Sequence, residues 1–210
     1  MTQTDADAGK LFADTKVIPV IRIDSADQAV ALARTLVDAG LKLLEITLRT
    51  PAALDAISRI AAEVPDAVVG AGTILSAHDL DRAARAGARF AISPGCTVSL
   101  YRASVDAPLP LIPGVSTASE VLLGMDHGHE YFKFFPAEAA GGTAMLKSWA
   151  GPLPQASFVP TGGITADKAA DYLALPNVIA VGGSWMVPDK AIASGDWDSI
   201  ASLARACASL

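Results

Sequence analysis

The sequence predicts an α/β fold: a single (β/α)8 TIM barrel over residues 1–210, with a short N-terminal helix. Three observations support this prediction. Eight short apolar or β-branched runs recur along the chain, and successive runs begin between 19 and 26 residues apart. The segments between them carry helix-start and helix-end signals. Near-continuous apolar runs are typical of parallel strands buried on both faces, and eight strand–helix units fit the smaller members of the barrel class.

Length and composition agree with one folded domain. The chain has 210 residues, of which 51% are hydrophobic and 18% are charged. A disordered chain would contain fewer apolar residues and more charge. No apolar run approaches the roughly 18 residues of a membrane span, and the polar N-terminus lacks the basic and apolar regions of a secretion signal. We therefore expect a soluble, cytoplasmic protein that does not insert into a membrane.

Charge and cysteine content exclude further classes. Sixteen basic residues against 22 acidic ones give a net charge of −6. No basic stripe is available to neutralise phosphates, so the sequence argues against nucleic-acid binding. Cys96 and Cys207 are too few for a disulfide framework and too far apart for a metal motif. A small anionic ligand stays compatible with this charge if a few cations and backbone N–H groups converge.

The predicted strands come first along each strand–helix unit. Apolar and β-branched residues dominate them, as expected for buried strands. The eight runs are 17–21, 43–47, 68–72, 90–93, 109–113, 131–135, 157–161 and 178–182. Residues 4–13 are expected to add the short helix ahead of the first strand.

Helix starts can be read between the strands. Ser25 and Thr117 each begin a capping-box pattern, in which Ser or Thr is followed three residues later by Gln or Glu. Thr50 precedes Pro51, which predicts an N-cap with proline in the first helical turn.

Helix faces and ends follow from periodicity and glycine. Gly40 and Gly87 each follow a helical stretch and suit C-terminal caps. Apolar residues in two segments recur at i, i+3, i+4 and i+7, the spacing of a helix that packs one face on a sheet. The two sets are Ala29, Leu32, Ala33 and Leu36, and Ile200, Leu203, Ala204 and Cys207. The second set makes Cys207 a core residue.

The competing architecture is an open doubly wound sheet. That fold needs a glycine-rich nucleotide-binding loop after its first strand. The candidate Gly70-Ala71-Gly72 has Leu75 where a third glycine should stand, and the chain contains no Gly-Lys-Ser/Thr motif. The barrel is therefore favoured.

Lys133 is the most informative polar residue. Reactive side chains of a barrel lie at the C-terminal ends of its strands, and Lys133 stands in the aromatic run 131–135. Burial disfavours a charged ammonium, and a neutral amine can attack a ketone to form a Schiff base. Alternatively, Lys133 lies at a strand edge and reaches water along its stem.

Glu45 raises the same question in the run 43–47. Glu45, Thr47 and Arg49 share one strand parity, so those within the strand point to the same side. Glu45 is either a general acid/base or the structural ion-pair partner of Arg49. Arg49 is either that partner or a bidentate clamp for a carboxylate.

Two glycine pairs follow the last two predicted strands. They are Gly162-Gly163 and Gly182-Gly183, and Ser184 comes directly after the second. Barrels often bind phosphate at these two positions, because glycine lets backbone N–H groups approach an anion. The alternative is that these glycines serve tight turns alone.

The remaining candidates are weaker. His127 and His129 precede the sixth strand, at the opposite end of the barrel from the expected site. Cys96 follows a Pro-Gly turn and is interpreted as a small apolar filler. No His, Asp or Glu grouping has metal-ligand spacing, so no metal is expected.

Seven motifs at the strand ends carry a family resemblance. They are LEITLRT at 44–50, VGAGT at 69–73, FAISPG at 90–95, LIPG at 111–114, FKFFPAE at 132–138, PTGGI at 160–164 and VGGSW at 181–185. Together they resemble the bacterial 2-keto-3-deoxy-6-phosphogluconate (KDPG) aldolases, also called KDPG/4-hydroxy-2-oxoglutarate aldolases. The motifs stand in family order, and the first ten or so residues are not covered.

The resemblance implies a class I aldolase on a (β/α)8 barrel, a homotrimer that needs no metal or other cofactor. Its substrate is a small phosphorylated 2-keto acid, cleaved in the Entner–Doudoroff pathway to pyruvate and glyceraldehyde 3-phosphate. Cleavage of 4-hydroxy-2-oxoglutarate to pyruvate and glyoxylate is a further implied activity. Lys133 matches the Schiff-base lysine and Glu45 the proton-transferring carboxylate. Arg49 and Thr73 match residues that hold the pyruvate carboxylate.

The same resemblance implies the rest of the substrate site. Pro94 and Phe135 match residues around the pyruvate moiety, and Thr161 matches a position linked to stereochemical preference. The implied phosphate site consists of Gly162, Gly163, Gly183 and Ser184.

Three alternatives stay open beside this interpretation. One is another phosphosugar-binding barrel enzyme, such as an isomerase, and a second is an aldolase for the galactonate epimer. A third is a phosphosugar-binding module without catalysis. The joint presence of Lys133, Glu45 and Arg49 favours an aldolase over the isomerase and the binding module.

Overall fold

The structure is a computed structural model that describes residues 3–210, with side chains from residue 8 onward. The strands are β1 (Val17–Ile21), β2 (Leu43–Thr47), β3 (Val68–Gly72), β4 (Ala91–Ile92), β5 (Leu111–Ile112), β6 (Gly114–Val115), β7 (Tyr131–Phe134), β8 (Ser157–Pro160) and β9 (Val181–Gly183). The helices are α1 (Gln3–Phe12), α2 (Ala26–Asp38), α3 (Ala53–Glu63), α4 (Ala77–Arg85), α5 (Val98–Val105), α6 (Ala118–Asp126), α7 (Gly142–Trp149), α8 (Ala166–Leu173), α9 (Asp189–Ser194) and α10 (Trp197–Ala208). None of the helices in this range is both long and apolar enough to cross a bilayer.

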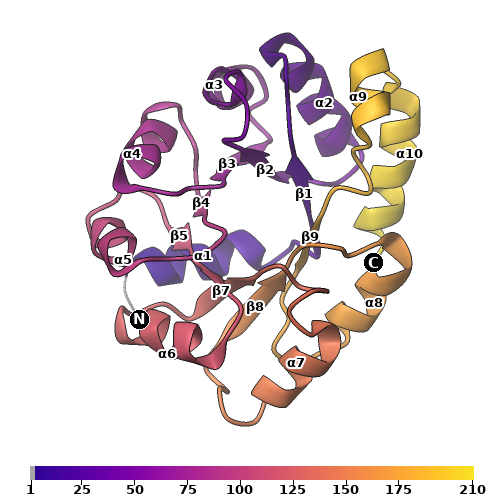
Figure 1. Cartoon of the computed structure of the whole chain (residues 1–210). Coiled ribbons are helices and arrows are strands. Elements are labelled where there is room, and N and C mark those ends of the chain that lie inside the picture. Colours follow the sequence, from indigo (N-terminus) through magenta and orange to yellow (C-terminus); the bar gives the residue numbers. More distant parts are fainter. Residues whose placement is uncertain (1–2) are drawn as a thin grey trace.

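The strands form two parallel sheets at the centre of the molecule. Six strands pair in the order β5-β4-β3-β2-β1-β9, and three pair in the order β6-β7-β8. Helices α2 to α10 surround the strands, and α1 lies behind them in Figure 1. The predicted α/β class, the parallel strands and the short N-terminal helix are thus confirmed.

Pro113 divides one predicted strand into two. It stands between β5 and β6, which belong to different sheets. Proline has no N–H to donate to a ladder, so the run 109–113 cannot pair continuously. The last predicted strand, 178–182, is also altered: Val178 makes only an isolated bridge to Phe158, and β9 begins at Val181.

One of the two predicted capping boxes forms. The Thr117 hydroxyl accepts from the backbone N–H of Glu120 at 3.3 Å, and the Glu120 carboxylate accepts from the Thr117 N–H at 2.9 Å. Ser25 is the N-cap of α2, but its side chain makes no capping bond. Gln28, the other half of that box, instead donates to the carbonyl of Ile192 at 3.1 Å. A tertiary contact to α9 has replaced the local one.

Of the other predicted helix ends, the two C-terminal glycines are confirmed and the Thr50 N-cap is not. Gly40 and Gly87 follow α2 and α4 with φ of +99° and +90°, which confirms their role as C-terminal glycines. The N-cap of α3 is Ala52 and not Thr50. The Thr50 hydroxyl donates to the carbonyl of Ile23 at 2.5 Å. It therefore connects the loop after β2 to the loop after β1 and does not cap α3.

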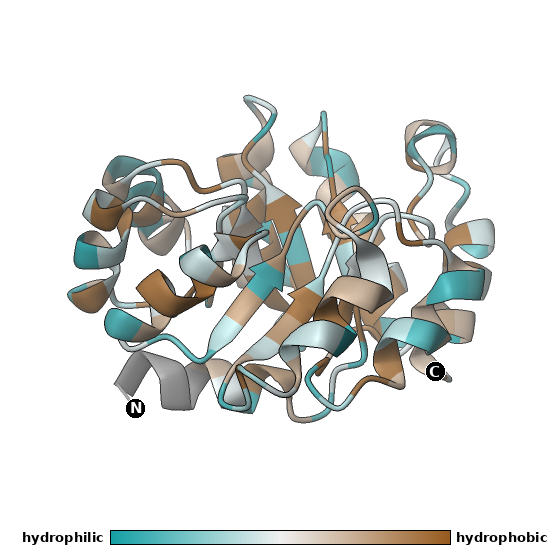
Figure 2. Cartoon of the chain, turned by 60° about the horizontal axis from the view of Figure 1, so that its bottom comes forward, coloured by the Kyte–Doolittle hydropathy of each residue, from teal (hydrophilic) through white to brown (hydrophobic). Residues whose placement is uncertain are grey.

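Helix burial follows the predicted stripes with one exception. The four residues of the α2 stripe are all buried. In α10, Ile200, Ala204 and Cys207 are buried, whereas Leu203 is 37% exposed. Figure 2 shows apolar segments on the strands and on parts of the helices around them. The buried face of α10 is therefore narrower than the predicted i, i+3, i+4, i+7 stripe.

A second apolar cluster joins α1 to the strands. Phe12 of α1 belongs to it, together with Ile18 at the start of β1 and Leu43 at the start of β2. Further along the same face of β2 come Glu45 and Thr47, which are 1% and 2% exposed. This face of β2 thus changes from apolar to polar toward the strand's C-terminal end, and the polar site lies at that end.

Candidate active site

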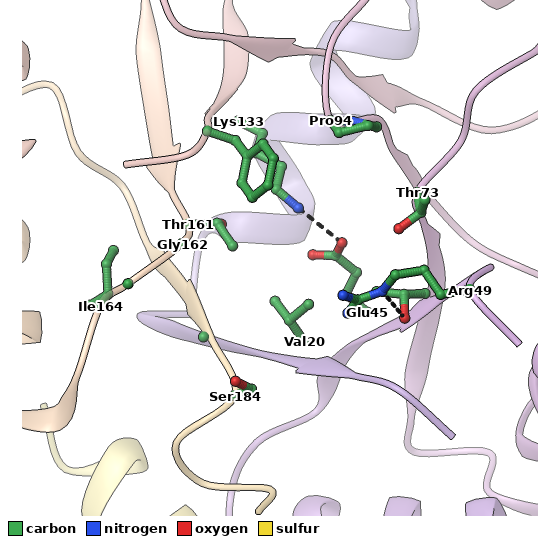
Figure 3. Close-up of a pocket in the computed structure, with 14 residues that line it drawn as sticks. Val20, Glu45, Arg49, Thr73, Pro94, Lys133, Thr161, Gly162, Ile164 and Ser184 are labelled. Carbon is green, nitrogen blue, oxygen red and sulfur yellow. Dashed lines mark hydrogen bonds and ion pairs between the residues drawn. The ribbon is translucent and has the colours of Figure 1, made fainter. Parts of the chain in front are cut away.

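A cavity of about 200 Å³ lies at the C-terminal ends of the strands and gathers every residue that the family resemblance implies for the site, whereas Gly182 of the second glycine pair is not in its lining. Its lining is Val20, Glu45, Thr47, Arg49, Thr73, Pro94, Lys133, Phe135, Thr161, Gly162, Gly163, Ile164, Gly183 and Ser184. These residues come from strands and loops spread over the whole chain (Figure 3).

Lys133 and Glu45 meet inside this cavity. The Lys133 Nζ donates to the Glu45 Oε1 at 3.1 Å, and the two side chains are 7% and 1% exposed. Lys133 stands in the middle strand of its sheet, paired with Gly114 on one side and Val159 on the other. The alternative of a strand-edge lysine is therefore wrong. Each charge depends on the other, because removing one partner would leave a buried charge uncompensated.

Arg49 has a different partner from the one considered for it. Its Nε donates to the Thr47 Oγ1 at 3.0 Å, and the Thr47 hydroxyl donates to the carbonyl of Ile21 at 2.9 Å. No carboxylate among the described side chains lies within ion-pair distance of Arg49. The structural pairing of Arg49 with Glu45 is wrong, and the cation borders the cavity without a counter-ion from residues 8–210.

Thr73 holds an unusual backbone conformation directly after β3. Its φ is +61°, and it is the one non-glycine residue in the described chain with positive φ. A β-branched residue is strained there, at a cost of about 1–3 kcal/mol. Figure 3 shows its hydroxyl directed toward the cavity. The fold maintains a strained backbone at a point where a side chain faces the site.

Phe135 and Pro94 provide apolar wall. The Lys133 Nζ lies 5.3 Å from the centroid of the Phe135 ring. Pro94 follows β4 and lines the cavity from another strand end (Figure 3). Such a wall lowers the local dielectric beside the amine and strengthens electrostatic interactions within the cavity.

The glycine pairs require glycine for reasons of space and backbone shape. Gly162 and Gly163 have φ of +106° and +76°. A Cβ at Gly183 would lie 1.9 Å from the Trp185 ring, so the indole fills the place of a side chain there. The turn interpretation is correct for Gly162 and Gly163, whereas Gly182 and Gly183 lie within β9 and are glycine for reasons of space. Bare backbone at both places is compatible with anion binding, since it presents N–H groups. Ser184 adds an exposed hydroxyl at the rim.

The weaker candidates lie outside the cavity lining. His129 is buried, and burial together with the nearby His127 lowers its pKa to about 4. Burial raises the pKa of the Cys96 thiol to about 12, so it stays protonated. Within the described residues, no group of three or more His, Cys, Asp and Glu side chains could hold a metal ion.

Two lining residues, Val20 and Ile164, were missed from the sequence, and a third, Thr47, was named only for its strand parity and was given no role. Val20 shares strand parity with Ile18, but β1 is apolar and buried throughout, so its sequence does not mark which face points inward. Ile164 follows the first glycine pair, and no sequence signal marks it as part of the site.

Comparison with known proteins agrees with this geometry. The sequence profile of the family described as "KDPG and KHG aldolase" matches residues 9–203. The KHG/KDPG aldolase of Escherichia coli (strain K12) is 53% identical over 189 residues, which cover 90% of this chain and 89% of the relative.

Two solved structures are similar along almost the whole chain. The KDPG aldolase from Legionella pneumophila, with pyruvate captured as a covalent carbinolamine intermediate, has 47% identity and a TM-score of 0.92, covering 94% of this chain and 96% of that one. The 2-keto-3-deoxy-6-phosphogluconate aldolase of Zymomonas mobilis ZM4 with 3-phosphoglycerate has 46% identity and a TM-score of 0.91, covering 97% and 96%. The chain therefore belongs to the KDPG and KHG aldolase family.

Proposed function

We propose that this chain is a class I aldolase that reversibly cleaves KDPG to pyruvate and glyceraldehyde 3-phosphate, with Lys133 as the nucleophile. The observation that carries the proposal is the contact between the Lys133 Nζ and the Glu45 Oε1, at 3.1 Å, inside a cavity bordered by Arg49. The Legionella relative supports it, because pyruvate is bound there as a covalent carbinolamine.

The amine must first lose a proton, and Glu45 is the adjacent acceptor. Transfer of one proton from Lys133 to Glu45 leaves a neutral amine, which attacks the C2 ketone of the substrate. Proton transfers convert the adduct to a neutral carbinolamine, and Glu45 as a carboxylic acid then protonates its hydroxyl. Water leaves and an iminium forms. Glu45 is now a carboxylate again, ready for the next step.

Cleavage uses the iminium as an electron sink. Glu45, directly or through a water, takes the proton of the C4 hydroxyl, the C3–C4 bond breaks, and its electron pair moves into the iminium to give an enamine. Glyceraldehyde 3-phosphate leaves, and Glu45 returns the proton to C3. Hydrolysis of the resulting imine releases pyruvate and regenerates Lys133. One carboxylate serves every transfer because each reverses its protonation state.

The rest of the cavity is assigned to substrate binding. Arg49 and Thr73 hold the carboxylate next to the reacting ketone, and a guanidinium can bind it through two parallel hydrogen bonds. Pro94 and Phe135 pack on the pyruvate moiety, and Thr161 faces the carbons whose stereochemistry the enzyme selects. The substrate's phosphate is assigned to the glycine-rich strand ends, where Gly162, Gly163, Gly183 and Ser184 bind it.

We infer that the two sheets form one closed (β/α)8 barrel and a single domain over residues 1–210. Only Pro113 separates β5 from β6. On the opposite side, the bridge between Thr161 and Gly182 connects the end of β8 to β9. The homotrimer and the cytoplasmic location stay predictions.

A second substrate, 4-hydroxy-2-oxoglutarate, fits the same chemistry. The pair of Lys133 and Glu45, with Arg49 beside them, lies apart from the glycine loops and does not depend on a phosphate (Figure 3). We expect this substrate to be cleaved with a lower kcat/KM than KDPG. An isomerase would have no use for the buried amine.

The experiment that tests the proposal is reductive trapping. Pyruvate plus borohydride should modify Lys133 and abolish activity, and peptide mapping should locate the adduct. Lys168, a lysine outside the cavity lining, serves as the internal control and should stay unmodified. Glu45→Gln should still form the imine, but more slowly because Glu45 also assists that step, and should lose turnover about 10²–10⁴-fold, the scale of a lost general base. An adduct on another lysine, or none, would overturn the class I assignment.

A further inference from the structure

A hydrogen-bonded cluster lies just outside the cavity and has no role in the mechanism above. It joins Glu138, which follows β7, to two side chains of α8. The Tyr172 hydroxyl donates to the Glu138 Oε1 at 2.5 Å, and the Lys168 ammonium bonds the other carboxylate oxygen. Both oxygens of Glu138 are therefore engaged on the same helix.

The backbone of this segment is in turn bonded to the first glycine loop. The N–H of Glu138 donates to the carbonyl of Gly162 at 3.1 Å, and the N–H of Ala137 donates to that of Thr161 at 2.8 Å. A Cβ at Gly163 would lie 2.9 Å from both the Cβ and the Cγ of Glu138. The loop lies directly against the Glu138 backbone and stem.

The loop needs such support because of its own sequence. Gly162 and Gly163 both have positive φ, and glycine has more backbone freedom than any other residue. Backbone N–H groups bind an anion well only when they are already held in place, since ordering them on binding would cost affinity. Glu138 contacts the loop and the helix that follows it. Its backbone N–H bonds the carbonyl of Gly162, and its side chain bonds α8, which begins only three residues after Gly163.

The charges of the cluster suit a place near an anion. Hydrogen bonding to Lys168 lowers the pKa of Glu138, so the carboxylate is ionised at neutral pH. Its negative charge is compensated by Lys168, which limits repulsion of a phosphate on the loop. Burial and then Glu138 raise the pKa of Tyr172, so its hydroxyl stays a donor. The ion pair is partly exposed, with side chains 45% and 31% exposed, so its contribution to global stability is small.

We propose that Glu138 is a positioning residue for substrate specificity: by bonding Lys168 and Tyr172, it holds the Gly162–Gly163 loop in the conformation that binds the substrate's phosphate. This inference rests on the proposed function, because it requires a phosphate on that loop.

The test compares a phosphorylated and an unphosphorylated substrate. Glu138→Leu removes both hydrogen bonds to α8, and Glu138→Gln keeps an acceptor for Tyr172 while removing the charge. Glu138→Leu should raise KM for KDPG about 10- to 100-fold, and Glu138→Gln should restore most of that loss. Turnover of 4-hydroxy-2-oxoglutarate and the yield of the trapped pyruvate imine should both stay within about twofold of wild type. Glu63→Leu is the matched control, because Glu63 forms a partly exposed pair with Arg59 on the surface of α3.

Each outcome has a distinct meaning. Equal losses for both substrates would overturn the inference, because they would mean that Glu138 supports the whole fold. If Glu138→Leu does not fold, Tyr172→Phe replaces it, and an unchanged KM for KDPG in that variant would likewise overturn the inference. A wild-type enzyme without any preference for the phosphorylated substrate would instead contradict the proposed phosphate site itself.

Discussion

The carboxylate of Glu45 occupies the space that a side chain at Gly72 would fill. The two residues lie on paired strands, and a Cβ placed on Gly72 would come within 2.1 Å of the Glu45 Oε1 and 2.7 Å of its Cγ. The carboxylate that we propose as the general base can therefore lie beside Lys133 only because β3 ends in glycine. Gly72, a residue without a side chain, is thus part of the geometry of the proposed site.

Gly72→Ala should displace the Glu45 carboxylate and lower kcat about 10- to 1000-fold, a range that overlaps the loss of a general base. Overpacking should also lower the free energy of unfolding by about 1–3 kcal/mol. Steady-state kinetics and denaturant unfolding measure the two effects. Gly151→Ala is the control, because a Cβ there would meet nothing within 4 Å. Unchanged kcat in Gly72→Ala would mean that the carboxylate tolerates a shift.

Thr47→Val should weaken binding of the substrate carboxylate. The Thr47 hydroxyl gives its proton to the carbonyl of Ile21, so its oxygen is free to accept from Arg49. Valine keeps the shape and removes this bond, and the guanidinium loses its orientation. We expect KM for KDPG to rise about tenfold, the scale of a hydrogen bond to a charged group, with kcat changed much less. Thr47→Ser should restore KM, and a failure to do so would contradict the positioning role.

Ser184→Ala should affect only the phosphorylated substrate. Loss of one hydrogen bond to a charged group corresponds to roughly 1–3 kcal/mol in kcat/KM for KDPG. In the proposed complex the phosphate lies far from the breaking bond, and we expect its binding to help fix C4 against Glu45. Parallel assays with 4-hydroxy-2-oxoglutarate provide the comparison. If both substrates lose equally, Ser184 supports the fold and not the phosphate.

His129 should make the protein less stable as the pH falls below neutrality. In the unfolded chain it takes up a proton near its ordinary pKa of 6.5, whereas in the folded protein burial lowers the pKa to about 4. The stabilising contribution is therefore complete above pH 6.5 and is lost progressively as the pH falls toward 4. The loss amounts to at most about 3 kcal/mol.

Urea unfolding between pH 4 and 7 measures this dependence. His129→Gln should flatten the slope over that interval, whereas His78→Gln, at an exposed position, should leave it unchanged. An equally steep slope in His129→Gln would assign the acid sensitivity to other groups.

The sequence was sufficient for the parts of this protein that depend on strand pattern. Lys133 and Glu45 stand out because charged residues interrupt buried runs, and strand ends converge in any parallel α/β fold. It was insufficient where a distant contact replaces a local one. Gln28 and Thr50 carry local capping signals, yet both side chains bond backbone of other segments.

The bonds of Glu138 to α8 show the same limit. Glu138 lies 30 residues from Lys168 and 34 from Tyr172 in sequence, and nothing in either segment marks the pairing. Only the folded structure brings them together.

The packing of the Trp185 ring on Gly183 has a practical consequence. An indole emits at a wavelength that depends on the electric field around it, and here the ring lies against the loop assigned to the phosphate. Arrival of a dianion on that loop should shift the emission, whereas Trp149, packed between Phe134 and Phe158, is shielded by neighbouring rings. Trp185 should therefore act as a built-in optical reporter, read against the emission of Trp149 and Trp197, through which ligand arrival can be followed without label, coupling enzyme or turnover.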